Sequence, residues 1–384
     1  KKFNEGKKIA IIGAGPAGLS CAYFLALYGH QVTVFEKQEQ LGGMLKMGIP
    51  SFRLEKDVID AEIDVLRLLG VEFKTGVEVG KDLTLDTLRA EGYKGFYLAI
   101  GAQNGRKLGV EGEDAPEVIS GVELLRGAAL GKNVQLSGEV IVIGGGNVAI
   151  DVARTAARTG AKNVRMYCLE SREEMPALDE EIDEANAEGV SIVNRFGPKR
   201  IIAENGKVTG VEFKKVISVF DDNHCFSPKY NENDTIIVPA DYVILSIGQS
   251  IDWGNLLNGS KVELAGGRAK ADDFTYQTSA PDVFVGGDCY SGPKFAIDAI
   301  AAGKQGAESL HRFVWAGHDL ILGRDRRQYK ELDKNNLDVR SYDNTPRQKP
   351  AHISENEGCF KDTRATMTAA QVKAESGRCL GCGA

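Results

Sequence analysis

Short apolar runs alternate with segments of helical periodicity along most of the chain. A run of four apolar residues at 9–12 predicts a buried strand, and the apolar positions within 54–69 recur at the spacing of an amphipathic helix. Alternation of strands and helices is typical of an α/β protein with parallel sheets. In the first third of the chain, the pattern predicts strands at 9–12, 31–35, 71–79 and 95–103 and helices at 19–27 and 54–69.

The opening pattern of strand, glycine turn, helix and strand occurs a second time. Residues 139–143 predict a strand, residues 150–159 a helix and residues 163–169 a further strand, with Glu170 directly after it. An internal repeat of this kind indicates two copies of one structural unit. Further along, the pattern predicts an acidic helix at 171–190, an antiparallel flap within 190–245, a strand at 282–288, an Ala-rich helix at 296–315 and a polar arm from about 318.

The first glycine turn carries the residues that dinucleotide binding requires. Gly13, Gly15 and Gly18 form G-x-G-x-x-G between a strand and a helix, and Glu36 ends the next strand. The first glycine permits the tight turn, the second lets a pyrophosphate approach the backbone, and the third lets helix and strand pack closely. The acid is placed to accept hydrogen bonds from ribose hydroxyls. The second copy, G-x-G-x-x-A at 144–149, has the same form, so two dinucleotides are expected.

Composition and charge narrow the class of protein. The chain has 384 residues and a net charge of −7, which gives no sign of affinity for nucleic acid. No apolar run is long enough for a transmembrane helix. Seven cysteines in a chain of this size are too few for a disulfide framework and are typical of a reduced, cytoplasmic protein.

Two of the cysteines form a Cys-x-x-Cys pair at the end of the chain. Cys379 and Cys382 are half of a tetrahedral sulfur site, which needs four ligands. We expect them to help hold an iron–sulfur cluster of the 4Fe-4S type, with Cys359 and either residues beyond Ala384 or another chain supplying further ligands. A zinc site and a pair of reduced cysteines on a tail remain the alternatives.

The chain resembles a known family in five features taken together. These are the two glycine motifs, LGGMLKMGIP (41–50), REEMPA (172–177) and the strand ending GGD (286–288). The family is that of the small (beta) subunit of glutamate synthase, which includes FAD subunits of electron-bifurcating NAD(P)H/ferredoxin oxidoreductase complexes. The resemblance implies an α/β fold with two Rossmann-like domains, of the pyridine nucleotide-disulfide reductase type, the NAD domain inserted into the FAD domain. The expected division is 1–130 and 248–317 for FAD, 131–247 for NAD(P)H and 318–384 for a C-terminal arm.

The resemblance also assigns cofactor-binding residues. For FAD these are Gly13, Gly15, Pro16, Ala17, Gly18, Glu36, Lys37, Gly43, Met44, Gly48, Ile49, Pro50, Val79, Ala99, Gly101, Gly287, Asp288, Ala296 and Ile297. For the nicotinamide cofactor they are Gly144, Gly146, Asn147, Val148, Ala149, Glu170 and Gly248. No catalytic side chain is expected, because hydride transfer between two cofactors needs proximity and not a nucleophile.

The chain departs from this family at the end of the second nucleotide motif. Members that use NADPH commonly have two arginines where this chain has Leu169 and Glu170. A carboxylate accepts hydrogen bonds from a free 2′-hydroxyl but repels a 2′-phosphate, so we expect NADH to be preferred over NADPH. Arg172, two residues further on, could instead favour the phosphate.

These observations support one function above two alternatives. We expect an FAD-containing NADH oxidoreductase subunit that passes electrons through the flavin to iron–sulfur or ferredoxin-type partner subunits. The first alternative is the small subunit of an NAD(P)H-dependent glutamate synthase. The second is a flavin relay subunit whose nucleotide site is inactive.

Overall fold

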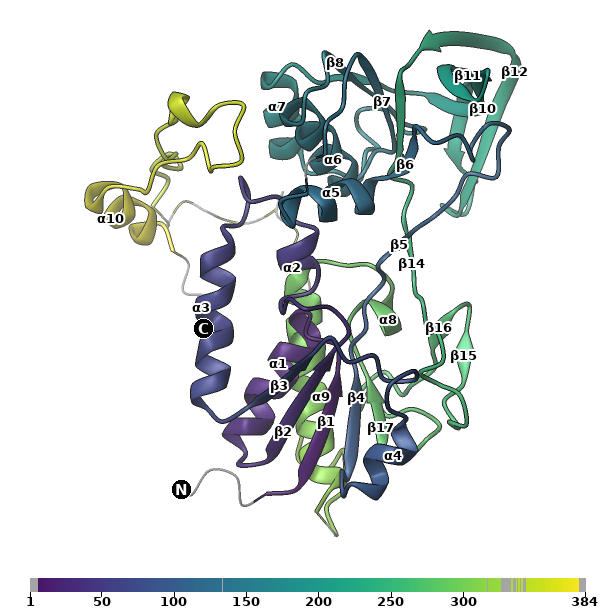
Figure 1. The fold of residues 1–384 in the computed structure, drawn as a ribbon. Coiled ribbons are helices and arrows are strands. Elements are labelled where there is room, and N and C mark those ends of the chain that lie inside the picture. Colours follow the sequence, from purple (N-terminus) through teal and green to yellow (C-terminus); the bar gives the residue numbers. More distant parts are fainter. Residues whose placement is uncertain are drawn as a thin grey trace.

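The computed structural model describes residues 6–379 except 133, 316, 326–332, 334–335, 337, 339 and 341–342. Two five-stranded parallel sheets organise this part of the chain (Figure 1). The first has the order β17-β4-β1-β2-β3, comprising β1 (Lys8–Ile12), β2 (Gln31–Glu36), β3 (Glu72–Thr75), β4 (Gly95–Leu98) and β17 (Val283–Val285). The second has the order β6-β13-β7-β8-β9, comprising β6 (Val118–Ser120), β7 (Glu139–Ile143), β8 (Asn163–Tyr167), β9 (Ser191–Val193) and β13 (Tyr242–Leu245).

The second sheet is inserted into the first along the chain. All five of its strands lie in sequence between β4 and β17. The two crossing segments pair with each other through the short antiparallel strands β5 (Asn104–Gly105) and β14 (Gln249–Ser250). The α/β fold with an inserted second dinucleotide unit, predicted from the repeat and the family resemblance, is thereby confirmed.

Helices cover one face of the first sheet. The apolar sides of α1 (Pro16–Leu27), α3 (Lys56–Leu68) and α9 (Ala296–Phe313) enclose one core with it. The opposite face packs against α4 (Leu85–Ala90) and the segment that carries β15 (Leu264–Ala265) and β16 (Arg268–Ala269). Both faces of the sheet are therefore buried, as the continuous apolar runs of its strands require.

The second sheet is covered by helices on one face and by a small antiparallel sheet on the other. The helices are α5 (Gly121–Ala129), α6 (Asn147–Arg158) and α7 (Asp179–Ala187). The antiparallel flap consists of β10 (Phe196–Glu204), β11 (Lys207–Phe220) and β12 (Phe226–Pro239). Tyr167 of β8 stacks on Phe213 of β11 with ring centroids 4.1 Å apart, which joins the flap to the sheet.

The remaining elements are short. They are α2 (Met44–Met47), α8 (Asp288–Ser291), a 3-10 helix (Ser354–Asn356) and α10 (Ala369–Gly377). The C-terminal part, yellow in Figure 1, lies beside α7 and the upper end of α3. No helix in the described part of the chain has the length and apolar character needed to cross a membrane.

Some predicted elements are shorter than their patterns indicated. The acidic helix begins at Asp179 and not at residue 171, because residues 171–178 form turns. The predicted strand 71–79 ends at Thr75, before a turn at Gly76, which has a φ of 67°. Helix α10 was not predicted, since it buries no apolar face; a capping box between Thr368 and Gln371 starts it.

The strand pairing bears on where the inserted unit starts. Val118–Ser120 of β6 pair with β13, and α5 packs its apolar side into the core of the second sheet. Residues 118–129 therefore belong with the second sheet, although the predicted boundary placed them with the FAD part. The division into FAD, NAD(P)H and arm segments otherwise remains a proposal.

Candidate dinucleotide sites

The first glycine turn is shaped by close backbone contacts. A Cβ at Gly13, which has a φ of 105°, would lie 2.4 Å from the carbonyl oxygen of Ala99, and one at Gly18 would lie 2.0 Å from that of Gly13. Both positions therefore exclude a side chain. At Gly15, by contrast, the nearest atom to a Cβ would be the Cα of Gly43 at 3.9 Å. The backbone of Gly15 is thus open to a ligand, as the motif predicts.

Glu36 is held in place at the end of β2. Its side chain is buried, and its two carboxylate oxygens accept hydrogen bonds from the backbone amides of Ala14 (2.8 Å) and Gln38 (2.9 Å). These bonds fix the orientation of the carboxylate, whose remaining lone pairs can accept from ribose hydroxyls. The strand that ends at Glu36 thus determines where an adenosine ribose could bind.

A cavity lies against this turn, and it encloses about 1020 Å³, part of it open to solvent. Thirteen of the residues assigned to FAD line it: Gly13, Gly15, Pro16, Ala17, Glu36, Lys37, Gly43, Met44, Val79, Ala99, Gly101, Gly287 and Asp288. They come from the end of β2, the first residues of α1, α2 and α8, and the loops at the carboxyl ends of the strands, which is where open α/β sheets bind ligands. The lining thus combines the glycine turn, which suits a pyrophosphate, with the carboxylates of Glu36 and Asp288, which suit hydroxyl groups.

Asp288 stands at the start of α8, partly shielded from solvent. Burial raises the pKa of its carboxyl, the backbone amide of Lys294 lowers it, and the charge of Asp298 raises it. One carboxylate oxygen accepts from that amide at 3.4 Å. The side chain can therefore accept hydrogen bonds from hydroxyl groups on a ligand in the cavity.

The second glycine turn repeats these features at β7 and α6. A Cβ at Gly144 would lie 2.4 Å from the carbonyl oxygen of Ser246, whereas one at Gly146 would have only Pro176 near it, at 3.8 Å. Asn147 is used structurally, because its side-chain oxygen accepts from the backbone amide of Leu178 at 2.9 Å. The first turn of α6 is open to the cavity, and free amides at a helix N-terminus favour a phosphate.

Glu170 lies next to this turn. Its carboxylate would be 2.7 Å from a Cβ at Gly145. Burial raises the pKa of Glu170, the charge of Glu174 raises it further, and that of Arg195 lowers it. Both nearby arginines already have acidic partners: Arg195 pairs with Glu174 (2.9 Å) and Arg172 with Asp179 (2.8 Å).

A second, larger cavity lies between the two units. It is lined on one side by the segment from Met44 to Arg53 and on the other by the second glycine turn and the flap. Nine further assigned residues line it: Gly48, Ile49, Gly144, Gly146, Asn147, Val148, Glu170, Gly248 and Ala296. Four residues line both cavities, namely Pro16, Met44, Asp288 and Ala299. The two cavities therefore adjoin at these residues.

Four of the assigned residues line neither cavity. Gly18 and Ala149 lie in the packing of helix against strand, and Pro50 is buried in the loop before α3. Ile297 is 68% exposed on the first turn of α9 and does not face either cavity. Its expected position beside the flavin therefore stays a prediction, whereas Ala296 and Ala299, on the same helix, do line a cavity.

Several lining residues were not predicted from the sequence. Trp253 and Gly254 line the first cavity, whereas Arg53, Arg106 and Phe226 line the second. They lie on loops and on the flap, far in sequence from either motif. Only the tertiary structure brings them to the cavities, and no local pattern in the sequence marks them.

The cysteines give no sign of dithiol chemistry at these cavities. Cys168 is the one cysteine among the described residues lining them, and burial raises its pKa to about 12. Cys379 is exposed, and Cys382 lies outside the described residues. Within the described part of the chain, no group of three or more metal-ligating side chains is brought together. The iron–sulfur prediction thus stays a prediction.

Known proteins share both the sequence and the fold. Residues 7–303 match the family described as pyridine nucleotide-disulphide oxidoreductase. The chain belongs to this family. Its likeness to Mycobacterium tuberculosis FprA in complex with NADPH (TM-score 0.69, 18% identity, covering 80% of this chain and 84% of that one) supports the same fold.

Two curated relatives are similar over most of this chain. The NADP(+)-dependent formate dehydrogenase subunit beta of Moorella thermoacetica is 37% identical over 98% of the chain, which spans 55% of that relative. The glutamate synthase [NADPH] small chain of Escherichia coli K12 is 36% identical over 80% of the chain and 69% of its own length. The resemblance to the glutamate synthase small subunit, stated from the motifs, is confirmed. Since the chain spans only about half of the first relative, the activity of any whole enzyme remains to be proposed.

Proposed function

We propose that the chain is an FAD-containing NADH oxidoreductase subunit that passes electrons from NADH through FAD to an iron–sulfur or ferredoxin-type partner. One observation carries the proposal: the two cavities, each built on its own dinucleotide motif, adjoin at Pro16, Met44, Asp288 and Ala299. Two cofactors bound at these motifs could place their reactive rings at this junction. Proximity of that kind is what hydride transfer requires.

The residues of the first cavity fit FAD. The open backbone of Gly15 and the N-terminus of α1 would hold the pyrophosphate, Glu36 the adenosine ribose and Asp288 the ribityl chain. When bound, FAD would accept a hydride and release electrons one at a time. The protein's part is to orient the two cofactors and to limit the access of water to the junction.

We infer that the nucleotide is NADH. Glu170 supports this, because its carboxylate lies beside the second glycine turn and both nearby arginines already pair with carboxylates. Two relatives have names that specify NADP(+) or NADPH, so this preference would separate the chain from them. The opposite preference would use Arg195, whose Nη1 has no hydrogen-bond partner while its Nη2 pairs with Glu174, or Arg172, to bind the 2′-phosphate.

The partner is proposed from the C-terminal segment and the relatives. A Cys379–Cys382 pair could contribute two thiolates to a 4Fe-4S cluster and so provide a path for single electrons out of the flavin. Formate dehydrogenase and glutamate synthase relatives are subunits by name, which supports a multi-subunit setting. Electron bifurcation would require a second acceptor in the same complex.

A glutamate synthase small subunit is the second candidate, favoured by the relative from Escherichia coli. A flavin relay with an inactive nucleotide site is a weaker one, because the second cavity retains an open glycine turn. Anaerobic titration of the purified flavoprotein with NADH and NADPH separates these candidates. Bleaching by NADH and reoxidation by ferredoxin support the proposal, whereas reoxidation by glutamine plus 2-oxoglutarate, with the synthase subunit present, supports the second. Absence of bleaching by either nucleotide would leave the relay.

A further inference from the structure

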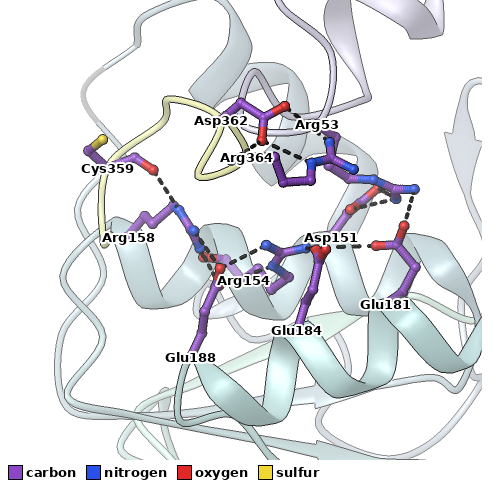
Figure 2. A network of polar contacts seen from close by, with 10 residues as sticks. All are labelled: Arg53, Asp151, Arg154, Arg158, Glu181, Glu184, Glu188, Cys359, Asp362 and Arg364. Atoms are coloured by element: carbon purple, nitrogen blue, oxygen red, sulfur yellow. Dashed lines mark hydrogen bonds and ion pairs between the residues drawn. The ribbon is translucent and has the colours of Figure 1, made fainter. Parts of the chain in front are cut away.

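A network of charged side chains joins the two units beside the second cavity (Figure 2). Arg53, which lies between α2 and α3 in the first unit, donates to both carboxylate oxygens of Asp151 on α6, each at 2.9 Å. The same guanidinium donates to Glu181 on α7 at 2.6 Å. One arginine of the first unit is therefore held by two carboxylates of the second: its Nη1 donates to both oxygens of Asp151, and its Nη2 donates to Glu181.

The ion pair connects the segments that are proposed to hold the two cofactors. Arg53 follows the loop at Gly48 and Ile49, while Asp151 lies one turn into the helix that begins at the second glycine motif. Arg53 and Asp151 both line the second cavity. Lys56 holds the loop at residues 45–49 in place, since its ammonium donates to the carbonyl oxygens of Leu45 (3.0 Å) and Ile49.

An aromatic residue beside Arg53 extends the contact. Phe52 is 3% exposed, and the guanidinium groups of Arg154 and Arg158, both on α6, lie 4.6 and 4.1 Å from its ring centroid. These arginines are in turn held by α7, where Glu188 accepts hydrogen bonds from both of them. Neighbouring residues of the first unit, 52 and 53, thus both dock on α6.

The C-terminal arm covers this network. The carbonyl oxygen of Cys359 accepts from Arg158 at 2.8 Å, and the ring of Phe360 lies 6.3 Å from that of Phe52. Figure 2 shows Asp362 and Arg364, which pair at 3.0 Å, across the network from α7. The arm therefore contacts Phe52 and Arg158, which are neighbours of Arg53 and Asp151 in the network.

We propose that Arg53 and Asp151 are positioning residues for hydride transfer, whose ion pair sets the separation of the two walls of the nucleotide cavity. The inference rests on the proposed function, since it concerns the distance between the two cofactors. A buried ion pair adds little to stability compared with apolar residues, but it fixes geometry. An error of about 1 Å in the position of reacting groups can cost on the order of 100-fold in rate.

The test compares Arg53→Met, Asp151→Asn and the double variant with wild type, and uses Arg67→Met as the matched control. Arg67 is an exposed arginine of α3 that pairs locally with Asp64. Anaerobic stopped-flow reduction of the bound flavin by NADH gives the rate at saturation and the nucleotide affinity separately. The first three variants are expected to lose about 10- to 100-fold in the saturating rate with a smaller change in affinity, without additivity in the double variant. Arg53→Lys should recover part of the rate.

Hydrogen exchange provides a readout that does not depend on turnover. Backbone amides of residues 48–54 and 147–153 are expected to exchange faster in Arg53→Met and Asp151→Asn than in wild type and Arg67→Met. Unchanged exchange would overturn the role of the ion pair in holding the walls, and an unchanged saturating rate would overturn its positioning role. If neither NADH nor NADPH reduces the flavin of the wild type, the proposed function fails and the positioning role fails with it. If the wild type is reduced and the variants are reduced as fast, only the positioning role fails.

Discussion

Replacement of Glu170 by glutamine tests the proposed nucleotide preference most directly. The substitution keeps the size of the side chain and removes one negative charge beside Gly145. Two like unit charges ~5 Å apart repel by ~3 kcal/mol at an effective dielectric of ~20, which corresponds to on the order of 100-fold in relative kcat/KM. Salt screening reduces this value, so we expect the NADPH/NADH ratio of kcat/KM to rise by about 30-fold or more in Glu170→Gln.

The same residue predicts how this preference depends on pH. Burial and the charge of Glu174 raise the pKa of Glu170. The carboxyl therefore becomes neutral at a higher pH than an ordinary glutamate, and the NADPH/NADH ratio of the wild type should rise as the pH falls. The 2′-phosphate also gains a proton on acidification, but this effect is shared by the Glu170→Gln variant and can be subtracted.

Steady-state flavin reduction with each nucleotide, at several pH values, is the assay. Glu173→Gln is the matched control, because Glu173 is exposed on the same turn and its loss should leave the ratio within about twofold. A wild type that prefers NADPH would refute the reasoning. So would a ratio that Glu170→Gln does not change, since the discrimination would then lie elsewhere in the cavity.

Three further predictions concern other parts of the chain. Gly18→Ala should lower the thermal midpoint, because the added Cβ would lie 2.0 Å from the Gly13 carbonyl oxygen, whereas Gly15→Ala should leave the midpoint of the apoprotein nearly unchanged and weaken FAD retention. Calorimetry measures the midpoints, and the flavin-to-protein ratio measures retention. Equal losses of stability in the two variants would contradict the distinction. Burial raises the pKa of Asp151 from 3.8 to about 6, against the opposing effect of Arg53, so the folded state holds a proton that the unfolded chain releases, and stability is lost as the pH rises through about 4 to 6. Relative to Asp151→Asn, the wild type should lose roughly 2 kcal/mol of unfolding free energy between pH 4 and 7 in urea unfolding, and parallel profiles would count against this. Cys379→Ser should lower the iron and acid-labile sulfide that copurify with the chain and its partners, and unchanged content would exclude the cluster.

The two dinucleotide motifs could be located from the sequence because their function depends on local backbone shape. Gly13 and Gly144 have the positive φ values that a tight turn requires, and Glu36 follows its strand by a spacing that βαβ geometry imposes. Twenty-two of the 26 assigned residues line one or both cavities. The glycine turns and Glu36 were found from local signals, which do not depend on a distant partner, whereas the other assignments came from the family resemblance.

Elements whose apolar residues follow no regular spacing were predicted less accurately from the sequence. Residues 171–178 have helix-compatible composition but form turns, held in part by the bond from the Leu178 amide to Asn147. Residues 118–129 belong to the second sheet through pairing of β6 with β13, which are separated by most of the inserted unit. Sequence patterns cannot show such a pairing, because its energy comes from contacts with residues far along the chain.

The sequence by itself determined that this protein has two Rossmann-like units with two glycine turns, and it predicted that Glu170 discriminates between NADH and NADPH. Only the tertiary structure decided that the two cavities adjoin at Asp288 and that Arg53 reaches Asp151 beneath the arm. The physical reason lies in the range of the interactions. Turns, caps and periodic apolar faces are imposed by neighbours within a few residues, whereas the ion pair joins residues 98 positions apart and exists only after both units have folded and docked.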